Sequence, residues 1–217
     1  EFARCDIRHI LTRHEQSAAH MADGFGRVSR KPGVCFATSG PGATNILTGI
    51  ATAQADSSPM IAVTGQVPVA MIGKDAFQES DIIGMANPVV KYAFQPRLPE
   101  DVPEAVRKGF YIAETGRPGP VLIDVPKDVQ QNEAPMEFPE EFKIQGYHPW
   151  YDPDMVACEK AIEMLLNSEK PIILAGGGTI ISSAFAELQS IAETLMLPVV
   201  TTFKGKGAFP ENHPLSL

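Results

Sequence analysis

Residues 33–45 read GVCFATSGPGATN, and this stretch decides the class of fold. It opens with an apolar run of strand length, which is followed by a tight turn rich in glycine and then by the start of a helix. Strand, turn and helix in this order are typical of a parallel sheet that helices cover. Cys35 lies inside the apolar run, where we expect it to be a small core residue.

Further apolar runs alternate with segments of helical periodicity along the whole chain. This alternation predicts an α/β fold built on a parallel sheet flanked by helices. The predicted strands are 33–38, 59–65, 120–126, 171–175 and 198–202, with 7–11 as a weaker candidate. The helical faces expected to point at a sheet are Ala18, Met21, Ala22 and Phe25; Val102, Ala105, Val106 and Phe110; Met155, Cys158, Ile162 and Leu165; and Phe185, Leu188, Ile191 and Leu195.

The stretch 131–152 differs from its flanks, because it is rich in proline and charge and has no sustained period. We interpret it as a linker between a first domain, 1–130, and the beginning of a second, Rossmann-like α/β domain, 153–217. Since the chain opens with Glu1 and stops soon after a strand of the second domain, we expect it to be a fragment of a longer polypeptide.

Composition excludes several classes of function. The 217 residues carry a formal net charge of -8 with no basic run, so a nucleic acid is not an expected partner. No apolar run reaches the ~18 to 20 residues that cross a bilayer, and no signal peptide is visible; we therefore expect a cytoplasmic location and no membrane partner. The 3 cysteines form no C-x-x-C pair, which argues against a zinc site or a disulfide framework.

Parallel sheets bind ligands at the carboxyl ends of their strands, so each junction after a strand is a candidate site. Glu15, within the sequence RHEQ at 13–16, falls at a helix start, where a capping carboxylate is the simplest interpretation. An H-E-x-x-H zinc motif fails because Ala18 stands where the second histidine belongs. The turn at 38–45 brings backbone amides close to a ligand, but Asn45 occupies the third glycine position of a dinucleotide fingerprint.

Two more junctions are candidates. The segment 65–79 is long and carries glycines, amides and an aromatic residue, which favours a functional loop over a simple connector. Glycines at 176–178 follow one predicted strand, and TTFKGKG at 201–207 follows the next. Two glycine-rich turns at consecutive strand ends suit a dinucleotide, and they are equally compatible with plain tight turns.

Four motifs together resemble one family. RHEQSAAHMADGFGR, ATSGPGATN, GQVPVAMIGKDAFQE and GRPGPVLIDVPKDVQ stand in the order and spacing found in thiamine-diphosphate-dependent enzymes, and AFQE and PKDVQ look most like the acetolactate synthases among them. The resemblance covers essentially the whole chain. It implies the pyrimidine-binding domain of the thiamine-diphosphate fold, without its first strand, followed by a truncated middle domain of the type that binds FAD.

The resemblance also implies roles for individual residues. Glu15 would contact N1' of the aminopyrimidine of thiamine diphosphate as a catalytic residue, in a largely apolar pocket that disfavours its ionised form. The other implied residues are Gly42 and Asn45 near the pyrimidine; Phe77, Gln78 and Lys127 as catalytic residues, with Pro68 and Lys127 in the substrate channel; and Gly176, Gly177, Gly178, Thr202 and Gly205 at FAD. Mg²⁺ would be held by a C-terminal domain that this chain does not contain.

The implied activity is that of an acetolactate synthase: decarboxylation of pyruvate and transfer of the two-carbon unit to pyruvate or 2-ketobutyrate, in branched-chain amino acid biosynthesis. The resemblance implies a homodimer or tetramer with shared active sites, allows for a regulatory small subunit, and predicts no turnover by this chain alone. A pyruvate oxidase or a sulfoacetaldehyde acetyltransferase is the alternative within the superfamily. From another class, a noncatalytic nucleotide-binding α/β module remains open.

Overall fold

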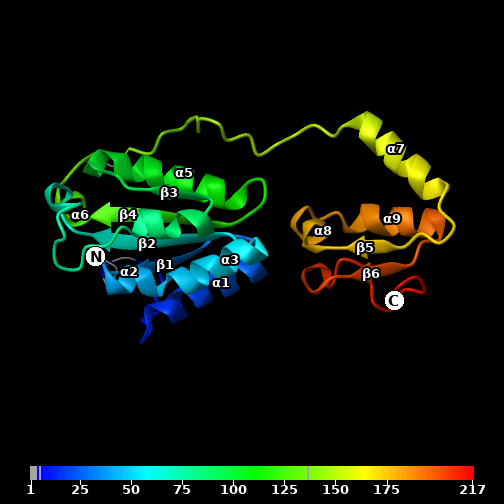
Figure 1. The fold of residues 1–217 in the computed structure, drawn as a ribbon, viewed down its shortest axis with the longest axis horizontal. Coiled ribbons are helices and arrows are strands. Elements are labelled where there is room, and N and C mark those ends of the chain that lie inside the picture. Colours follow the sequence, from blue (N-terminus) through cyan, green and yellow to red (C-terminus); the bar gives the residue numbers. More distant parts are fainter. Residues whose placement is uncertain (1–3, 5, 136) are drawn as a thin grey trace. The chain divides into compact units, whose positions relative to one another are not determined.

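The computed structural model describes residue 4 and residues 6–135 and 137–217. These form two compact units, a first that ends at Trp150 and a second that comprises Tyr151–Leu217 (Figure 1). Within the described residues, every helix is too short or too polar to span a bilayer.

The first unit is built on a four-stranded parallel sheet with the strand order β1-β2-β4-β3. The strands are β1 (Gly33–Ala37), β2 (Met60–Gln66), β3 (Tyr92–Phe94) and β4 (Pro120–Pro126). In the register of the central pair, Met60 is the partner of Pro120 and Gln66 is the partner of Pro126. All carboxyl ends therefore lie at one edge of the sheet, toward which the β4 arrow points in Figure 1.

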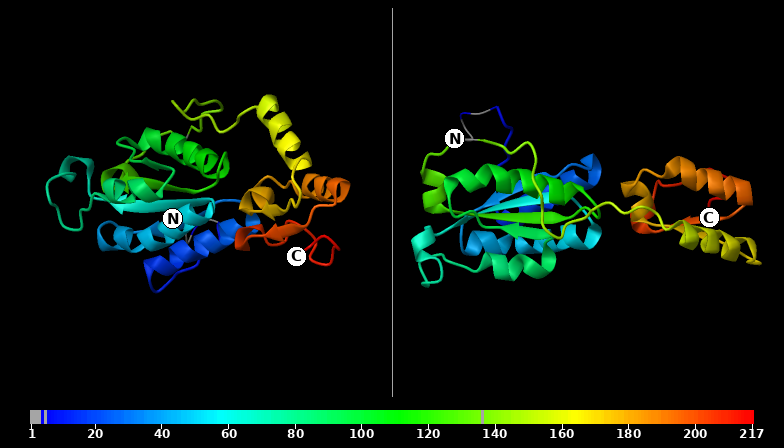
Figure 2. Two further views of the ribbon diagram at one scale, coloured as in Figure 1. Left: turned by 45° about the vertical axis from the view of Figure 1, so that its right-hand side comes forward. Right: turned by 90° about the horizontal axis from the view of Figure 1, so that it is seen from above.

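Helices cover both faces of this sheet, as the view from above in Figure 2 shows. The helices of the first unit are α1 (Glu15–Ser29), α2 (Pro41–Asn45), α3 (Leu47–Asp56), α4 (Ile82–Ala86), α5 (Val102–Glu114) and α6 (Lys127–Gln131). Short 3-10 turns add η2 (Val69–Met71), η3 (Asn87–Val89) and η4 (Pro99–Asp101).

Strand side chains alternate between two hydrophobic clusters, as a pleated sheet covered on both faces requires. Met60, Ala62 and Leu122 pack with residues of α1, α3 and α4 on one face. On the other face Ile61 and Ile123 pack with residues of α5. The predicted α/β class is therefore correct, and the predicted strands at 33–38, 59–65 and 120–126 are confirmed within one residue or two.

Three local predictions for the first unit are wrong. The 7–11 segment is not a strand, and its side chains lie exposed to solvent; β3, only 3 residues long, was not predicted. The buried face of α1 consists of Ala19, Ala22, Asp23 and Gly26, whereas Met21 and Phe25 are exposed. Small residues are needed there because a Cβ at Gly26 would come within 2.3 Å of the backbone oxygen of Pro59.

The predicted linker contains a segment that packs on the first unit. Ile144 and Tyr147 pack against the hydrophobic cluster beneath α5. The Tyr147 hydroxyl lies 2.9 Å from the backbone oxygen of Thr115 and 3.1 Å from Nζ of Lys91. Lys91 also donates to the backbone oxygens of Ile112 and Thr115, so its cation caps the carboxyl end of α5. Burial lowers the pKa of Lys91 to about 8.

The second unit pairs two parallel strands, β5 (Ile173–Ala175) and β6 (Val199–Thr201). Its helices are α7 (Met155–Leu166), α8 (Gly177–Ile181) and α9 (Phe185–Leu195), with the 3-10 turn η5 (Phe203–Gly205). Phe185 and Leu188 of α9 pack on its core as predicted. The stripe on α7 does not point into a core, because none of the helix's residues is buried and Met155 and Ile162 are 63% and 52% exposed.

Candidate functional site

Glu15 is the first residue of α1 and lies at the carboxyl edge of the sheet. The helix is capped by His14, whose Nδ1 accepts a hydrogen bond from the backbone N–H of Gln16 at 3.1 Å. The Glu15 carboxylate instead accepts a hydrogen bond from Nδ2 of Asn45, 30 positions along the chain, at 3.1 Å. The side chain of Glu15 is therefore directed to a tertiary contact, and it is not the helix cap.

A glycine turn separates Glu15 from the loop 67–80. Gly40 has a φ of 61° and packs so closely on this loop that a Cβ would lie 2.8 Å from the backbone oxygen of Gln78. At Gly42 a Cβ would lie 2.7 Å from Cγ2 of Thr38 and 3.5 Å from Oε1 of Glu15. The turn thus brings together Glu15, Gly42 and Asn45, and its other side contacts the backbone of Gln78.

Hydrogen bonds dominate the electrostatics of Glu15 in this chain. The hydrogen bond from Asn45, its own backbone N–H and the nearby His14 lower the pKa of the Glu15 carboxyl, and burial opposes them without reversing the direction. The hydrogen bonds outweigh desolvation because Glu15 is only partly buried in this chain. The expected apolar pocket that disfavours the ionised form refers to the site with thiamine diphosphate bound, so it stays a prediction.

The loop 67–80 carries the next group of predicted residues. Gln78 adopts a φ of 58° and rests against the glycine turn. Phe77 is 89% exposed. Pro68 precedes η2 at the start of the loop. The structure therefore brings Gln78 next to the Gly40 turn, whereas the ring of Phe77 extends into solvent.

Lys127 lies elsewhere on the same edge. It begins α6 and lines a cavity of about 730 Å³ that opens on the α5 side of the sheet. Thr38, Ser39 and Gln66 also line this cavity, while Glu15 and Pro68 are not among its lining residues. This cavity therefore contains Lys127 without Glu15.

In the second unit the two glycine-rich turns lie side by side at the ends of β5 and β6. A Cβ at Gly177 would lie 3.0 Å from Cβ of Lys204, and one at Gly205 would lie 2.2 Å from the backbone oxygen of Ala175. Oγ1 of Thr202 accepts a hydrogen bond from the backbone N–H of Gly205 at 3.1 Å. A Cβ at Gly176 would lie 3.9 Å from Oγ1 of Thr202, and one at Gly178 would meet no atom within 4 Å.

The cysteines and acidic residues add no metal centre within the part of the chain that the structure describes, since no group of 3 or more His, Cys, Asp or Glu side chains converges there. Cys35 is 3% exposed and belongs to the core, as predicted. Burial raises the pKa of its thiol to about 12. Cys158 is exposed, and Cys5 lies outside the described residues.

Sequence reasoning missed a buried polar network beneath the edge. Asp124 in β4 is 0% exposed and accepts hydrogen bonds from Oγ1 of Thr64 at 2.6 Å, Nε2 of Gln66 at 3.1 Å and Nε2 of Gln95 at 2.8 Å. Burial raises the pKa of Asp124, and the hydrogen bonds from Thr64, Gln95 and Gln66 oppose that rise. The sequence did carry a signal for this network, because Thr64, Gln66 and Asp124 are polar residues within otherwise apolar strands.

Comparison with known proteins identifies the class. Residues 1–85 match the family described as "Thiamine pyrophosphate enzyme, N-terminal TPP binding domain". Residues 158–217 match "Thiamine pyrophosphate enzyme, central domain". Together with the parallel sheet and the Glu15 site, these matches show that the chain belongs to the thiamine pyrophosphate enzymes.

Within that class, the chain is homologous to acetolactate synthase large subunits. It is 56% identical over 215 residues to the probable acetolactate synthase large subunit of Methanocaldococcus jannaschii, covering 98% of this chain and 36% of the relative. It is 46% identical over 216 residues to the acetolactate synthase large subunit of Corynebacterium glutamicum, covering 100% of this chain and 34% of that protein. The chain therefore spans about a third of the length of these relatives.

Proposed function

We propose that this chain is part of an acetolactate synthase, a cytoplasmic enzyme that decarboxylates pyruvate and transfers the two-carbon unit to a second 2-keto acid. With pyruvate as acceptor the product is 2-acetolactate, and with 2-ketobutyrate it is 2-aceto-2-hydroxybutyrate, an early step in branched-chain amino acid biosynthesis. The observation that carries the proposal is the hydrogen-bonded pair Glu15 and Asn45 beside Gly42, in a chain homologous to acetolactate synthase large subunits.

The residues at the edge fit an aminopyrimidine ring. A Cβ at Gly42 would crowd Cγ2 of Thr38 at 2.7 Å, so a glycine is what lets the turn pass this close to the Glu15 carboxylate, against which a flat ring would lie. When bound, thiamine diphosphate supplies a nucleophilic carbon and an electron sink for loss of carbon dioxide. Glu15 would bind the ring nitrogen N1' through its carboxyl group, and Asn45 would hold that carboxyl in place.

Glu15 has one chemical task in this proposal, which is to share a proton with N1'. The carboxyl is ionised in this chain, since hydrogen bonds lower its pKa. Covering it with the ring and with a partner domain removes water, which raises a carboxyl pKa and makes the shared proton accessible. Asn45 remains as the hydrogen-bond donor that orients the carboxylate.

Other residues would serve the substrate and the second cofactor. We assign Phe77 and Gln78 to the side of the site that faces the reacting centre, and Lys127 and Pro68 to the channel through which the 2-keto acid arrives. We assign FAD to Gly176, Gly177, Gly178, Thr202 and Gly205. The open space beside Gly176 and Gly178, where a Cβ would meet no atom closer than 3.9 Å, supports this assignment. Mg²⁺ and the diphosphate would be held by a further domain of the longer protein.

The proposed assembly is a homodimer or tetramer in which two subunits complete each active site, with a regulatory small subunit as a further partner. The designation "large subunit" of the relatives supports such a partner. For the chain by itself we expect no turnover, because it spans about a third of its relatives' length. Measurable acetolactate formation by the isolated chain would contradict this.

Product analysis of the full-length protein tests the function. Given pyruvate alone it should form 2-acetolactate, and with 2-ketobutyrate added it should also form 2-aceto-2-hydroxybutyrate. Acetyl phosphate formed from pyruvate, phosphate and oxygen would indicate a pyruvate oxidase instead, and acetyl phosphate formed from sulfoacetaldehyde and phosphate would indicate a sulfoacetaldehyde acetyltransferase. A protein that binds nucleotides and converts none of these substrates would be the noncatalytic module.

A further inference from the structure

The loop 67–80 is closed at its base by one side chain. Oε1 of Gln66 accepts a hydrogen bond from the backbone N–H of Val67 at 2.9 Å, and Nε2 of the same residue donates to the backbone oxygen of Ser80 at 2.9 Å. Nε2 also donates to the buried Asp124 at 3.1 Å, which fixes the Gln66 side chain from below. Both ends of the loop are therefore tied to the sheet.

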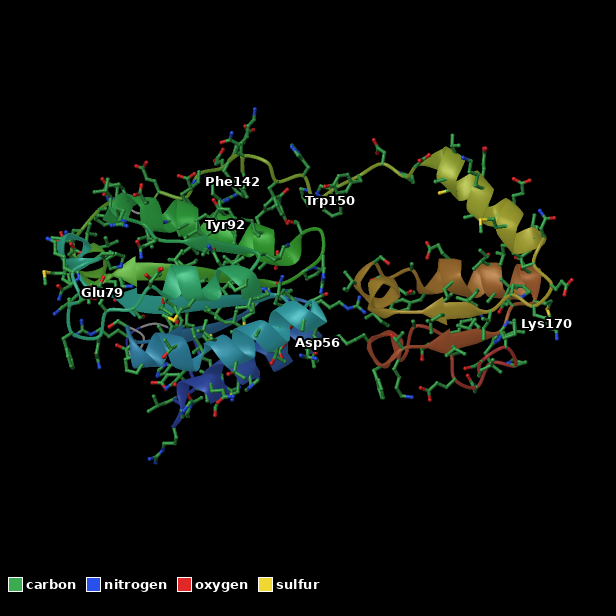
Figure 3. The ribbon with its side chains drawn as sticks, viewed as in Figure 1. Asp56, Glu79, Tyr92, Phe142, Trp150 and Lys170 are labelled. Carbon is green, nitrogen blue, oxygen red and sulfur yellow. The ribbon has the colours of Figure 1, made fainter. Side chains whose placement is uncertain are left out.

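A second side chain organises the loop from within. The carboxylate of Glu79 accepts hydrogen bonds from three backbone N–H groups, those of Ala76 at 2.9 Å, Lys74 at 3.3 Å and Gly73. The backbone N–H of Glu79 donates in turn to the oxygen of Ala76 at 2.9 Å. Figure 3 labels Glu79 at the end of the first unit toward which β4 points. These hydrogen bonds lower the pKa of the Glu79 carboxyl, which keeps it ionised.

The residues next to Glu79 in the sequence depend on this arrangement. Gln78 has a φ of 58°, a conformation that a non-glycine residue adopts only where its surroundings require it. Its backbone contacts the Gly40 turn, which leads to Gly42 and Glu15. Phe77 is 89% exposed, so its position is set by the backbone that carries it rather than by packing of its ring.

We infer that Glu79 is a positioning residue, which holds the backbone of residues 73–78 so that Phe77 and Gln78 are presented at fixed places beside the Gly40 turn. The inference rests on the proposed function, because it takes Phe77 and Gln78 to face the reacting centre. Glu79 itself contacts backbone amides of its own loop, and it acts on the reaction through the two residues before it.

The chemistry of the contact requires a carboxylate. An ionised carboxylate offers lone pairs on two oxygens and no donor, which matches three converging N–H groups. A glutamine at position 79 would offer one oxygen, and its amide hydrogens would face backbone N–H groups that are donors themselves. Glu79→Gln therefore removes the organisation of the loop with nearly no change in side-chain volume.

Hydrogen exchange of the full-length protein tests the structural half of the inference. The amides of Gly73, Lys74 and Ala76 should exchange roughly 5-fold faster or more in Glu79→Gln, which is the factor expected when a net hydrogen bond is lost. Glu79→Asp keeps the carboxylate on a shorter side chain and should restore part of the protection. Glu114→Gln, a matched change at an exposed position at the end of α5, should leave these amides unchanged.

Steady-state kinetics test the functional half. Glu79→Gln should lower kcat for acetolactate formation by ~10- to 100-fold, as misplacement of positioning groups does, while the affinity for thiamine diphosphate stays at the parent value. Glu79→Asp should recover part of kcat, and Glu114→Gln should retain all of it. Unchanged kcat together with faster exchange would overturn the inference, and so would reduced kcat with unchanged exchange.

The failure of the inference and that of the proposed function are distinguishable. If the full-length parent forms no acetolactate, the proposed function fails, whatever Glu79 does. If the parent forms acetolactate and Glu79→Gln behaves as the parent in both measurements, only the positioning role of Glu79 is wrong.

Discussion

The pKa of a carboxyl group is shifted in opposite directions at the carboxyl edge of the sheet and in the interior just beneath it. At the edge, hydrogen-bond donors lower the pKa of Glu15 and of Glu79. Beneath it, burial raises the pKa of Asp124 although three side chains donate to its carboxyl group. Near solvent, hydrogen bonds decide the pKa; in the interior, desolvation outweighs them.

The two regions also have different roles. The interior network joins the fully buried Asp124 to Thr64, Gln66 and Gln95, and through Gln66 it fixes both ends of the loop 67–80. The edge carries exposed groups whose positions this support determines. Substitutions at the edge should therefore change the reaction, whereas substitutions in the interior should change stability.

The largest effect is expected at Glu15. In the full-length enzyme, Glu15→Gln should slow exchange of the C2 proton of bound thiamine diphosphate by ~10²- to 10⁴-fold, the range in which a positioned proton-transfer group contributes. Stability should change little, because Glu15 is only partly buried. NMR of the quenched cofactor after a pulse of D2O measures the exchange, with Glu114→Gln as the matched control. Exchange at the parent rate would reject the role of Glu15.

Asp124→Ala should cost about 3 kcal/mol of local stability, because it leaves the donors of Thr64, Gln66 and Gln95 unsatisfied in the interior. Hydrogen exchange of the β2 and β4 amides in the full-length protein measures this cost. Asp101→Ala is the control, since that exposed aspartate makes no side-chain cap hydrogen bond at the start of α5. Equal protection in both variants would show that the network contributes no net stability.

A smaller effect on local stability is expected at Tyr147, in the segment that packs against the hydrophobic cluster beneath α5. Tyr147→Phe removes the hydroxyl that contacts Thr115 and Lys91, which should weaken the docking by about 1 kcal/mol. Hydrogen exchange of residues 140–150 measures the local opening. Tyr151→Phe, at a residue that is 85% exposed, should have no effect. Identical exchange in the two variants would mean that the hydroxyl does not hold the segment.

The smallest expected effect is a pH dependence that comes from Asp124. Because folding raises the pKa of this carboxyl, its contribution to stability is present below the unfolded pKa and is lost as the pH rises through the folded pKa. Asp124→Asn carries no such proton, so the parent should lose stability relative to the variant as the pH rises from the acid side. Urea titrations followed by circular dichroism at several pH values measure the difference, and a constant difference would contradict the raised pKa.

Sequence patterns predicted the elements that burial dictates. The apolar runs at 59–65 and 120–126 became the central strands, because only strands covered on both faces are apolar at nearly every position. Exposed elements were less predictable: β3 is too short to show a pattern, and α7 has an apolar stripe that this chain leaves uncovered. The faces of α1 were misjudged because its close packing selects small residues rather than large ones.

What the sequence by itself determined is the α/β class, the central strands and the motifs that match thiamine pyrophosphate enzymes. Only the tertiary structure decided that Asn45 donates to Glu15 and that Gln78 contacts Gly40. It also decided that Glu79 and Asp124 support the loop 67–80. The reason is physical. Periodicity reports which side chains leave water, whereas hydrogen bonds between residues 30 to 60 positions apart depend on how the strands and turns come together in space.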